Sequence, residues 1–120
     1  MNIKALFLSA AFTLAAITGA SAAGNVASTS QHGSGNFSAI GQSGNGNFTG
    51  VGQVGRGNQS LSLQSGKGNL AATAQFGKNN QSVTDQSGKH NLSATVQFGK
   101  DNMADTTQTG KNNVSVTVQH

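Results

Sequence analysis

The chain alternates small polar and apolar side chains in six-residue segments that recur every eleven residues. Each segment follows an Asn and ends at a Gln, and residues 70–75 and 92–97 show the form, rich in Thr, Val, Ala and Ser. Such alternation predicts a β-strand about 20 Å long, at roughly 3.3 Å per residue. The Gly-x-x-Asn stretch after each Gln predicts a tight turn, because Gly accepts positive φ and Asn tolerates the left-handed region and bonds to its own backbone.

These segments and turns form one Gln-x-Gly-x-x-Asn repeat without a single insertion or deletion. A fixed period this short predicts a stacked solenoid, in which one unit buries nothing alone. The positions of the repeat are Gln31, Gln42, Gln53, Gln64, Gln75, Gln86, Gln97, Gln108 and Gln119; Gly33, Gly44, Gly55, Gly66, Gly77, Gly88, Gly99 and Gly110; and Asn25, Asn36, Asn47, Asn58, Asn69, Asn80, Asn91, Asn102 and Asn113.

One parity set of each strand is uniform. The second and fourth residues after each Asn, together with the Gln, are uncharged, and the former are small or β-branched, whereas the other set admits Gln59, Gln81, Asp85 and Asp105. Because side chains alternate between the faces of a strand, we expect the uniform set to line a narrow interior. Asn and Gln then form inward ladders, each amide bonding to the amides above and below. The inverted assignment, with the other set as the core, stays open.

A second period of 22 residues lies over the first. The residue after Gln is His32, Val54, Phe76, Phe98 or His120 in alternate units, and Ser or Thr in the units between them. Two units therefore make one layer, which predicts an all-β, amyloid-like fold: a two-sheet parallel β-solenoid with layers about 4.8 Å apart. Nine strands place the first and last in the same sheet. Copies stacked end to end would then rotate by half a turn or leave residues 26–31 unpaired.

The first 22 residues are typical of a secretory signal peptide. Lys4 provides a positive start, residues 5–17 form an apolar run, and Ala20-Ser21-Ala22 is a small-residue cleavage site. We expect residues 1–22 to be removed on export, leaving a repeat domain of residues 23–120. No second hydrophobic segment follows, so the sequence predicts no transmembrane helix.

Composition narrows the possible functions. The chain has no Cys, and so no disulfide framework, and it has no Pro to block extended pairing. From residue 23 onward there are six basic and three acidic side chains, a balance too weak to indicate nucleic-acid binding. No catalytic constellation or cofactor motif is present, and no metal site is expected at His32, His90 and His120, which lie in predicted turns.

The repeat resembles the curlin repeat of curli fimbria subunits, the functional amyloids of bacterial biofilms. Residues 64–75 match the curlin pattern Gln-x-Gly-x-x-Asn-x-Ala-x-x-x-Gln in full, as do residues 97–108, and elsewhere Ser or Thr replaces most of the Ala residues. The resemblance covers essentially the whole repeat domain. It implies a secreted, cell-surface subunit that polymerises into a β-solenoid fibre for cell adhesion and biofilm matrix.

The same resemblance implies partners: other copies of the chain, a nucleator subunit and an outer-membrane secretion pore. The repeat begins at Asn25, whereas major curlin subunits carry a non-repetitive segment before their repeats. The even spacing of eleven also resembles the nucleator-type minor subunit, so both roles stay open. No unit differs from the rest as a polar cap would, and we therefore expect open-ended stacking of copies.

Two surfaces are candidates for contacts. An uncharged outer face is expected at Phe48, Leu70, Leu92, Val96, Val114, Val116, Val118, Phe76 and Phe98, and we predict lateral bundling or adhesion there. Two edge rows of like charge are expected at Arg56, Lys67, Lys78, Lys89, Lys100 and Lys111. The rows either bind a matrix polysaccharide or host surface, or are solvated and slow premature assembly.

The alternative function, from a different class of protein, is that of a monomeric ice- or surface-binding solenoid. Its flat array would be the Thr column at positions 73, 84, 95, 106 and 117, if those side chains pointed outward. The flanking Ser, Ala and Gln columns and the lack of capped ends count against it.

Overall fold

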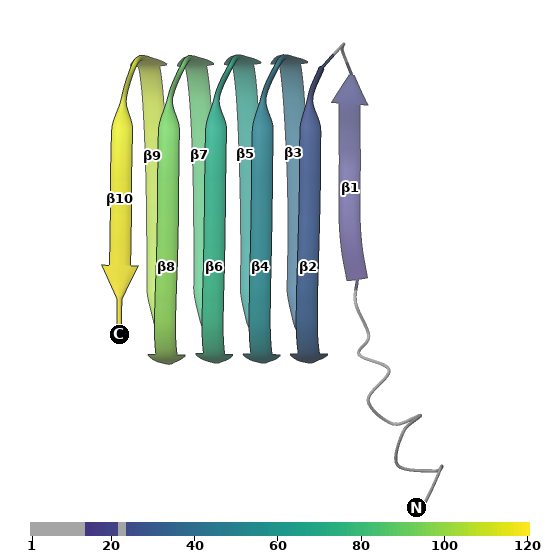
Figure 1. Ribbon diagram of the computed structural model, residues 1–120, viewed down its shortest axis with the longest axis vertical. Coiled ribbons are helices and arrows are strands. Elements are labelled where there is room, and N and C mark those ends of the chain that lie inside the picture. Colours follow the sequence, from purple (N-terminus) through teal and green to yellow (C-terminus); the bar gives the residue numbers. More distant parts are fainter. Residues whose placement is uncertain (1–13, 22–23) are drawn as a thin grey trace, which may run out of the picture.

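Residues 14–21 and 24–120 are described by the computed structural model, and they form ten strands and no helix (Figure 1). None of these residues belongs to a helix that could cross a membrane. The strands are β1 (Leu14–Ser21), β2 (Val26–Ser34), β3 (Phe37–Asn45), β4 (Phe48–Arg56), β5 (Gln59–Lys67), β6 (Leu70–Lys78), β7 (Gln81–Lys89), β8 (Leu92–Lys100), β9 (Met103–Lys111) and β10 (Val114–Gln119).

The strands build two facing sheets, one of β1-β3-β5-β7-β9 and one of β2-β4-β6-β8-β10. From β2 onward every pair is parallel and joins residues 22 apart, as Gln53 pairs with Gln75 and Gln75 with Gln97. Successive strands therefore alternate between the sheets, and two of them make one layer (Figure 1). The predicted two-sheet parallel β-solenoid is confirmed.

Strand β1 falls in the segment predicted to be a signal peptide. It pairs in parallel with β3, with a shift of register between Thr18 and Ala20. The other residues of that segment, 1–13 and 22, lie outside the described part of the chain, as does residue 23. Removal of residues 1–22 stays a prediction. Strands β2 to β10 pair only with one another apart from this single contact, so the solenoid of residues 24–120 has a complete ladder of its own.

The strands are longer than the sequence predicted. Each strand from β2 to β9 has nine residues, because pairing continues beyond the Gln through the Gly and the residue after it. Gly55, for example, pairs with Gly77, and Arg56 with Lys78. The Gly column comes very close together: a Cβ added to Gly77 would lie 1.9 Å from the carbonyl oxygen of Gly99. Glycine is thus needed here for close approach of neighbouring layers within the ladder, in addition to its positive φ.

The left-handed residue of each turn is the one before the repeat Asn, and the expectation that the repeat Asn occupies this conformation is wrong. The position is Gly in the first four turns and Asn79, His90, Asp101 and Asn112 in the last four, with φ from 57° to 68°. The repeat Asn instead turns its side chain inward, where backbone groups need partners.

The interior is narrow and mostly polar. Leu92 is 36% exposed and Ser93 1% exposed, which decides between the two assignments: the uniform set faces inward and the inverted assignment is wrong. The buried hydrophobic residues are only Ile40, Val51, Ala71 and Ala104 among those described. Several interior hydroxyls, including those of Ser62 and Thr84, have no hydrogen-bond partner. Stability therefore depends more on the ladders of backbone and amide hydrogen bonds than on a hydrophobic core.

Candidate assembly site

The Gln residues form two interior columns, one along each sheet. From Gln31 to Gln97, each side-chain Nε2 donates to the Oε1 of the Gln in the next layer, as from Gln53 to Gln75 and from Gln75 to Gln97, at 2.7 Å in both cases. The same Nε2 of Gln75 also donates to the backbone oxygen of Gln59 in the opposite sheet, at 2.9 Å. Each Gln thus joins its own layer to the next and one sheet to the other. Burial strengthens such bonds electrostatically and raises the cost of losing one.

The Asn residues also form columns, but their bonds differ from the predicted amide-to-amide ladder. The Oδ1 of Asn58 accepts the backbone N–H of Asn80 at 3.1 Å. The Nδ2 of Asn80 donates to the carbonyl oxygen of Phe76, at 3.1 Å, and to that of Gly99, at 3.3 Å. The shorter Asn side chain reaches the backbone of the turn and not the next amide. It thereby satisfies turn groups that the parallel ladder leaves without partners.

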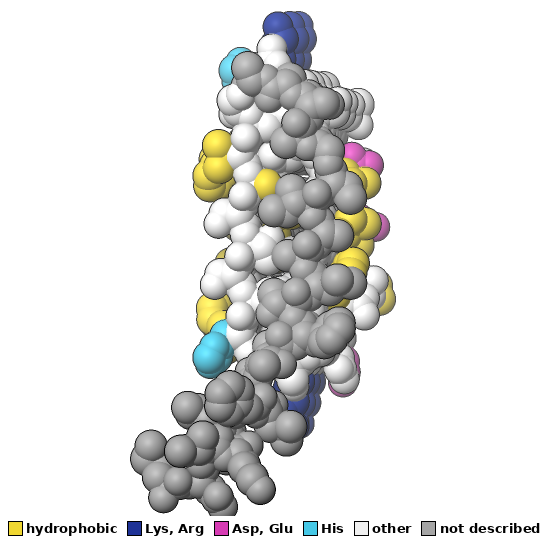
Figure 2. All heavy atoms as spheres, turned by 90° about the vertical axis from the view of Figure 1, so that its right-hand side faces the viewer, with side chains coloured by type: hydrophobic (Ala, Val, Ile, Leu, Met, Phe, Trp, Pro, Cys, Tyr) yellow, Lys and Arg dark blue, Asp and Glu magenta, His cyan; other side chains and the backbone are white. Residues whose placement is uncertain are grey.

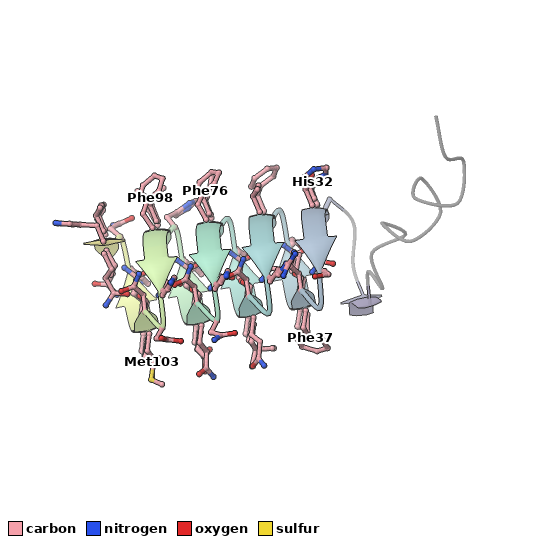
Figure 3. The ribbon with its side chains drawn as sticks, turned by 90° about the horizontal axis from the view of Figure 1, so that it is seen from below. His32, Phe37, Phe76, Phe98 and Met103 are labelled. Carbon is pink, nitrogen blue, oxygen red and sulfur yellow. The ribbon has the colours of Figure 1, made fainter. Side chains whose placement is uncertain are left out.

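The predicted apolar face is the outer face of the sheet formed by β2, β4, β6, β8 and β10. Eight of its nine residues are exposed and Val96 is half-buried. The rings of Phe76 and Phe98 stack with centroids 5.1 Å apart and point away from the interior (Figure 3). The first column of the face runs through Val26, Phe48, Leu70, Leu92 and Val114 in register.

The opposite face is more apolar than the sequence suggested. It exposes Phe37, Leu61, Leu63 and Met103, which belong to the outward parity set but were not predicted to form an apolar surface. Hydrophobic side chains gather on both sides of the solenoid in Figure 2. Exposed Asp85 and Asp105 interrupt this second face. The alternation of β3, β5 and β9 could have indicated these residues, because they share the outward parity of the two Asp side chains. The two faces therefore differ in charge more than in apolar content.

The six basic residues of the predicted edges each end a strand and are exposed. Register places Arg56, Lys78 and Lys100 in one row, and Lys67, Lys89 and Lys111 in the other. These rows appear in dark blue at both turn edges of the solenoid in Figure 2. Unit charges one layer apart would repel by about 1 kcal/mol in water without salt. Salt screens this repulsion, so the repulsion weakens as ionic strength rises.

The same repeat occurs in a known protein family. A family model described as the curlin associated repeat matches residues 23–55, which include β2, β3 and most of β4. The structure carries the same glutamine, glycine and asparagine columns from this segment through β10, at an unbroken spacing of 22 residues between paired strands. The chain contains the curlin associated repeat. No curated protein matches the sequence.

The three His residues of this curlin-repeat protein do not come together. His32, His90 and His120 are exposed at separate turns and strand ends. Within residues 14–21 and 24–120, no group of three or more His, Asp or Glu side chains could hold a metal ion. The chemistry that the curlin repeats do offer is directional hydrogen bonding at the outermost layers.

Proposed function

We propose that this curlin-repeat protein is the structural subunit of an extracellular, curli-like amyloid fibre, which grows by end-to-end addition of copies. The observation that carries the proposal is that each layer presents the same backbone and amide groups to its neighbour. A second copy can therefore bond to an outermost layer as an internal layer does. Such a contact joins different surfaces of two copies and stays open, which is the geometry of a fibre.

The outermost strands support this proposal. Within the described residues β2 pairs only with β4, and β10 only with β8, so each has one unpaired edge. Their interior side chains are also less covered: Thr29 and Thr117 are half-buried, whereas Thr84 and Thr95, which occupy the same position in central layers, are 1% exposed. An unpaired edge with partly covered interior residues is a template for another strand. Docking would complete both the ladder and the interior.

The location and partners come from the curlin family. Curli subunits lie outside the cell, and we infer that this chain is secreted to the cell surface, where it contributes to adhesion and biofilm matrix. A nucleator subunit and an outer-membrane secretion pore are the partners that the family suggests. A matrix polysaccharide or host surface would meet the two exposed rows of basic residues.

A nucleator-type minor subunit is the second candidate, favoured by the even eleven-residue spacing. The structure does not support a monomeric ice- or surface-binding solenoid, because the Thr column that would form its binding array is buried. Thr73, Thr84, Thr95 and Thr106 are only 1% to 6% exposed. Adding a small fraction of this protein to a slowly assembling curlin distinguishes a nucleator from a major subunit. A nucleator shortens the lag at a few per cent of the total protein, whereas a major subunit makes up the bulk of the fibre.

The proposed function is tested with residues 24–120, purified in denaturant and diluted into quiescent buffer. We expect fibres in electron micrographs and diffraction spacings near 4.8 Å along the fibre and 10 Å across it. Fibres that form only after seeds are added would also support a subunit role, with nucleation supplied by a partner. A stable, β-rich monomer that neither assembles nor responds to seeds would contradict the proposal.

Replacing Leu92 with Lys is expected to disperse fibre bundles into single filaments without preventing filament growth. Leu92 lies in the centre of the uncharged face, is 36% exposed and contributes little to the interior, so a charge there opposes lateral contact between fibres. Gln81→Lys is the matched control, since Gln81 is exposed on the opposite sheet. Bundle width in electron micrographs is the measurement. If Leu92→Lys fibres formed bundles of parental width, the apolar face would not be what drives lateral association.

A further inference from the structure

We propose that successive copies in the fibre are related by a half-turn about its axis, so that β9 and β10 of one copy pair with β2 and β3 of the next. The proposal rests on the proposed end-to-end assembly and specifies its contact. It identifies the interaction surface as two amide columns with opposite polarity at the two ends of the solenoid, and the partner as a second copy of this chain.

The acceptor end is at β2 and β3. The Nε2 of Gln31 donates to Gln53 at 2.7 Å, and that of Gln42 donates to Gln64 at 2.9 Å. The Oε1 atoms of Gln31 and Gln42 are both buried and without a hydrogen-bond partner. Every other Oε1 of the two columns accepts from the preceding layer. This end therefore presents two desolvated acceptors, one in each sheet.

The donor end is at β9 and β10. The Oε1 atoms of Gln108 and Gln119 accept from Gln86 and Gln97, at 2.7 and 2.8 Å, so only their Nε2 groups can extend the columns. Gln119 Nε2 already donates to the carbonyl oxygen of Met103, as interior Gln residues donate to the opposite sheet. What both side chains lack, within the described residues, is a Gln of a further layer. The two donors match the two acceptors in number and in sheet.

The Asn columns run with the opposite polarity, so that their acceptors lie at the β9 and β10 end and their donors at the β2 and β3 end. In each layer the Asn Oδ1 accepts the backbone N–H of the Asn 22 residues later, as Asn91 does from Asn113 at 3.1 Å. Asn102 and Asn113 have no later layer within the described residues, while the N–H groups of Asn25 and Asn36 have no earlier one. Joining β9 to β2 and β10 to β3 places Asn102 beside Asn25 of the next copy and Asn113 beside Asn36. All four amide columns then continue across the junction.

Only a half-turn satisfies both sheets. The solenoid of residues 24–120 has nine strands, of which β2 and β10 lie in the same sheet. Stacking by pure translation pairs β10 with β2 of the next copy and leaves an empty strand position between β9 and β3. The Oε1 of Gln42 then has no Gln donor, and the facing edges of β9 and β3 stay unpaired. A half-turn exchanges the sheets and preserves parallel strand direction, so Gln108 meets Gln31 and Gln119 meets Gln42.

Strand β1 shows that the edge of β3 accepts a parallel strand. It lies on that edge at the side of the solenoid in Figure 1, but its register aligns Ala20 with Gln42. Alanine carries no amide, and Gln42 Oε1 remains without a partner. β10 of a second copy offers Gln119 at the same place and needs no shift of register. Removal of residues 1–22 would leave this edge open for it.

Cysteine cross-linking distinguishes the two arrangements, because the chain contains no native Cys. The half-turn places Val116 beside Ala39 of the next copy, whereas translation places it beside Ser28. Neighbouring parallel strands hold paired Cα atoms about 4.8 Å apart, within the range of a disulfide. Neither bond can form inside one copy: Ala39 is in the other sheet, and Ser28 is four layers, about 19 Å, from Val116.

The test compares two variants of residues 24–120, V116C/A39C and V116C/S28C, assembled under reducing conditions and then oxidised. We expect most V116C/A39C protein to run as a covalent ladder after the fibres are dissolved in denaturant, and V116C/S28C to run as monomer. The reverse pattern would overturn the half-turn while leaving the fibre function intact. Single-Cys variants control for contacts between neighbouring fibres.

A measurement on the unsubstituted chain covers the case in which the variants fail to assemble. Electron cryomicroscopy should give one copy per about 22 Å with a rotation near a half-turn, against about 24 Å without rotation for translation. A reconstruction of the second kind would overturn the proposal. Absence of fibres from the unsubstituted chain, with or without seeds, would contradict both this arrangement and the proposed function.

Discussion

Replacing Gly77 with Ala is expected to prevent stable assembly. An added Cβ would lie 1.9 Å from the carbonyl oxygen of Gly99 and 2.9 Å from its carbonyl carbon, and φ at Gly77 is 126°. The clash is with backbone that is itself paired in the ladder, so relief requires two central layers to separate. We expect a loss of about 4 kcal/mol or more, which corresponds to a rise of roughly a thousandfold in the critical concentration for fibre growth.

Gly52→Ala is the matched control for Gly77→Ala. Gly52 faces outward on β4 and pairs in register with Ala74, and no atom lies within 4 Å of an added Cβ. We expect this variant to assemble at the parental critical concentration or below it, because Ala loses less chain entropy than Gly on folding. The comparison is made from the soluble protein left at equilibrium after sedimentation. Equal behaviour of the two variants would show that the close Gly column is unimportant.

Replacing Gln75 with Glu is expected to impair assembly severely at neutral pH. Gln75 is fully buried, and its Nε2 donates to Gln97 Oε1 and to the carbonyl oxygen of Gln59. A carboxylate would set a charged acceptor against these two acceptors in the middle of the column. Leaving an uncompensated charge in a buried site costs about 3–5 kcal/mol. The measurement is again the critical concentration, compared with that of the parental chain.

The pH dependence of Gln75→Glu follows from burial of the new carboxyl group. Burial disfavours the charged form and raises the pKa of this Glu above its unfolded value of about 4.3. The destabilisation is therefore present above the raised pKa and decreases as pH falls through it, when the neutral acid can donate one hydrogen bond. Gln59→Glu, on the exposed outer face of β5, should assemble normally at neutral pH. A pH-independent defect in Gln75→Glu would contradict the hydrogen-bonding role given to Gln75.

Much of the fold could be predicted because one spacing determines it. A repeat of eleven residues with Gln, Gly and Asn at fixed offsets allows only one stacking register, and the alternation after Leu70 or Leu92 identifies the inward side chains. The period of 22 in the residue after Gln then predicts two strands per layer. Both features depend on local order along the chain, which is why sequence alone was sufficient for them.

The details that failed depend on contacts between layers. Gly77 resembles a turn residue in sequence, and only its approach to Gly99 shows that it belongs to the ladder. Asn80 resembles a partner for another amide, but its side chain is too short and bonds to the backbone. The apolar character of the second face was missed because the charged residues Asp85 and Asp105 lie among its outward positions, and that face was therefore taken to be polar. The polarity of the Gln columns depends on which way each amide is turned, which no sequence pattern specifies.

Mass per unit length of the fibre shows whether the assembled unit is the stacked solenoid. A solenoid that stacks end to end contains one copy per about 22 Å of a single filament. Scanning transmission electron microscopy of residues 24–120 should give this value. A flat amyloid, in which identical strands of different copies stack in register, contains one copy per about 4.8 Å, and a density four- to fivefold higher would contradict the account.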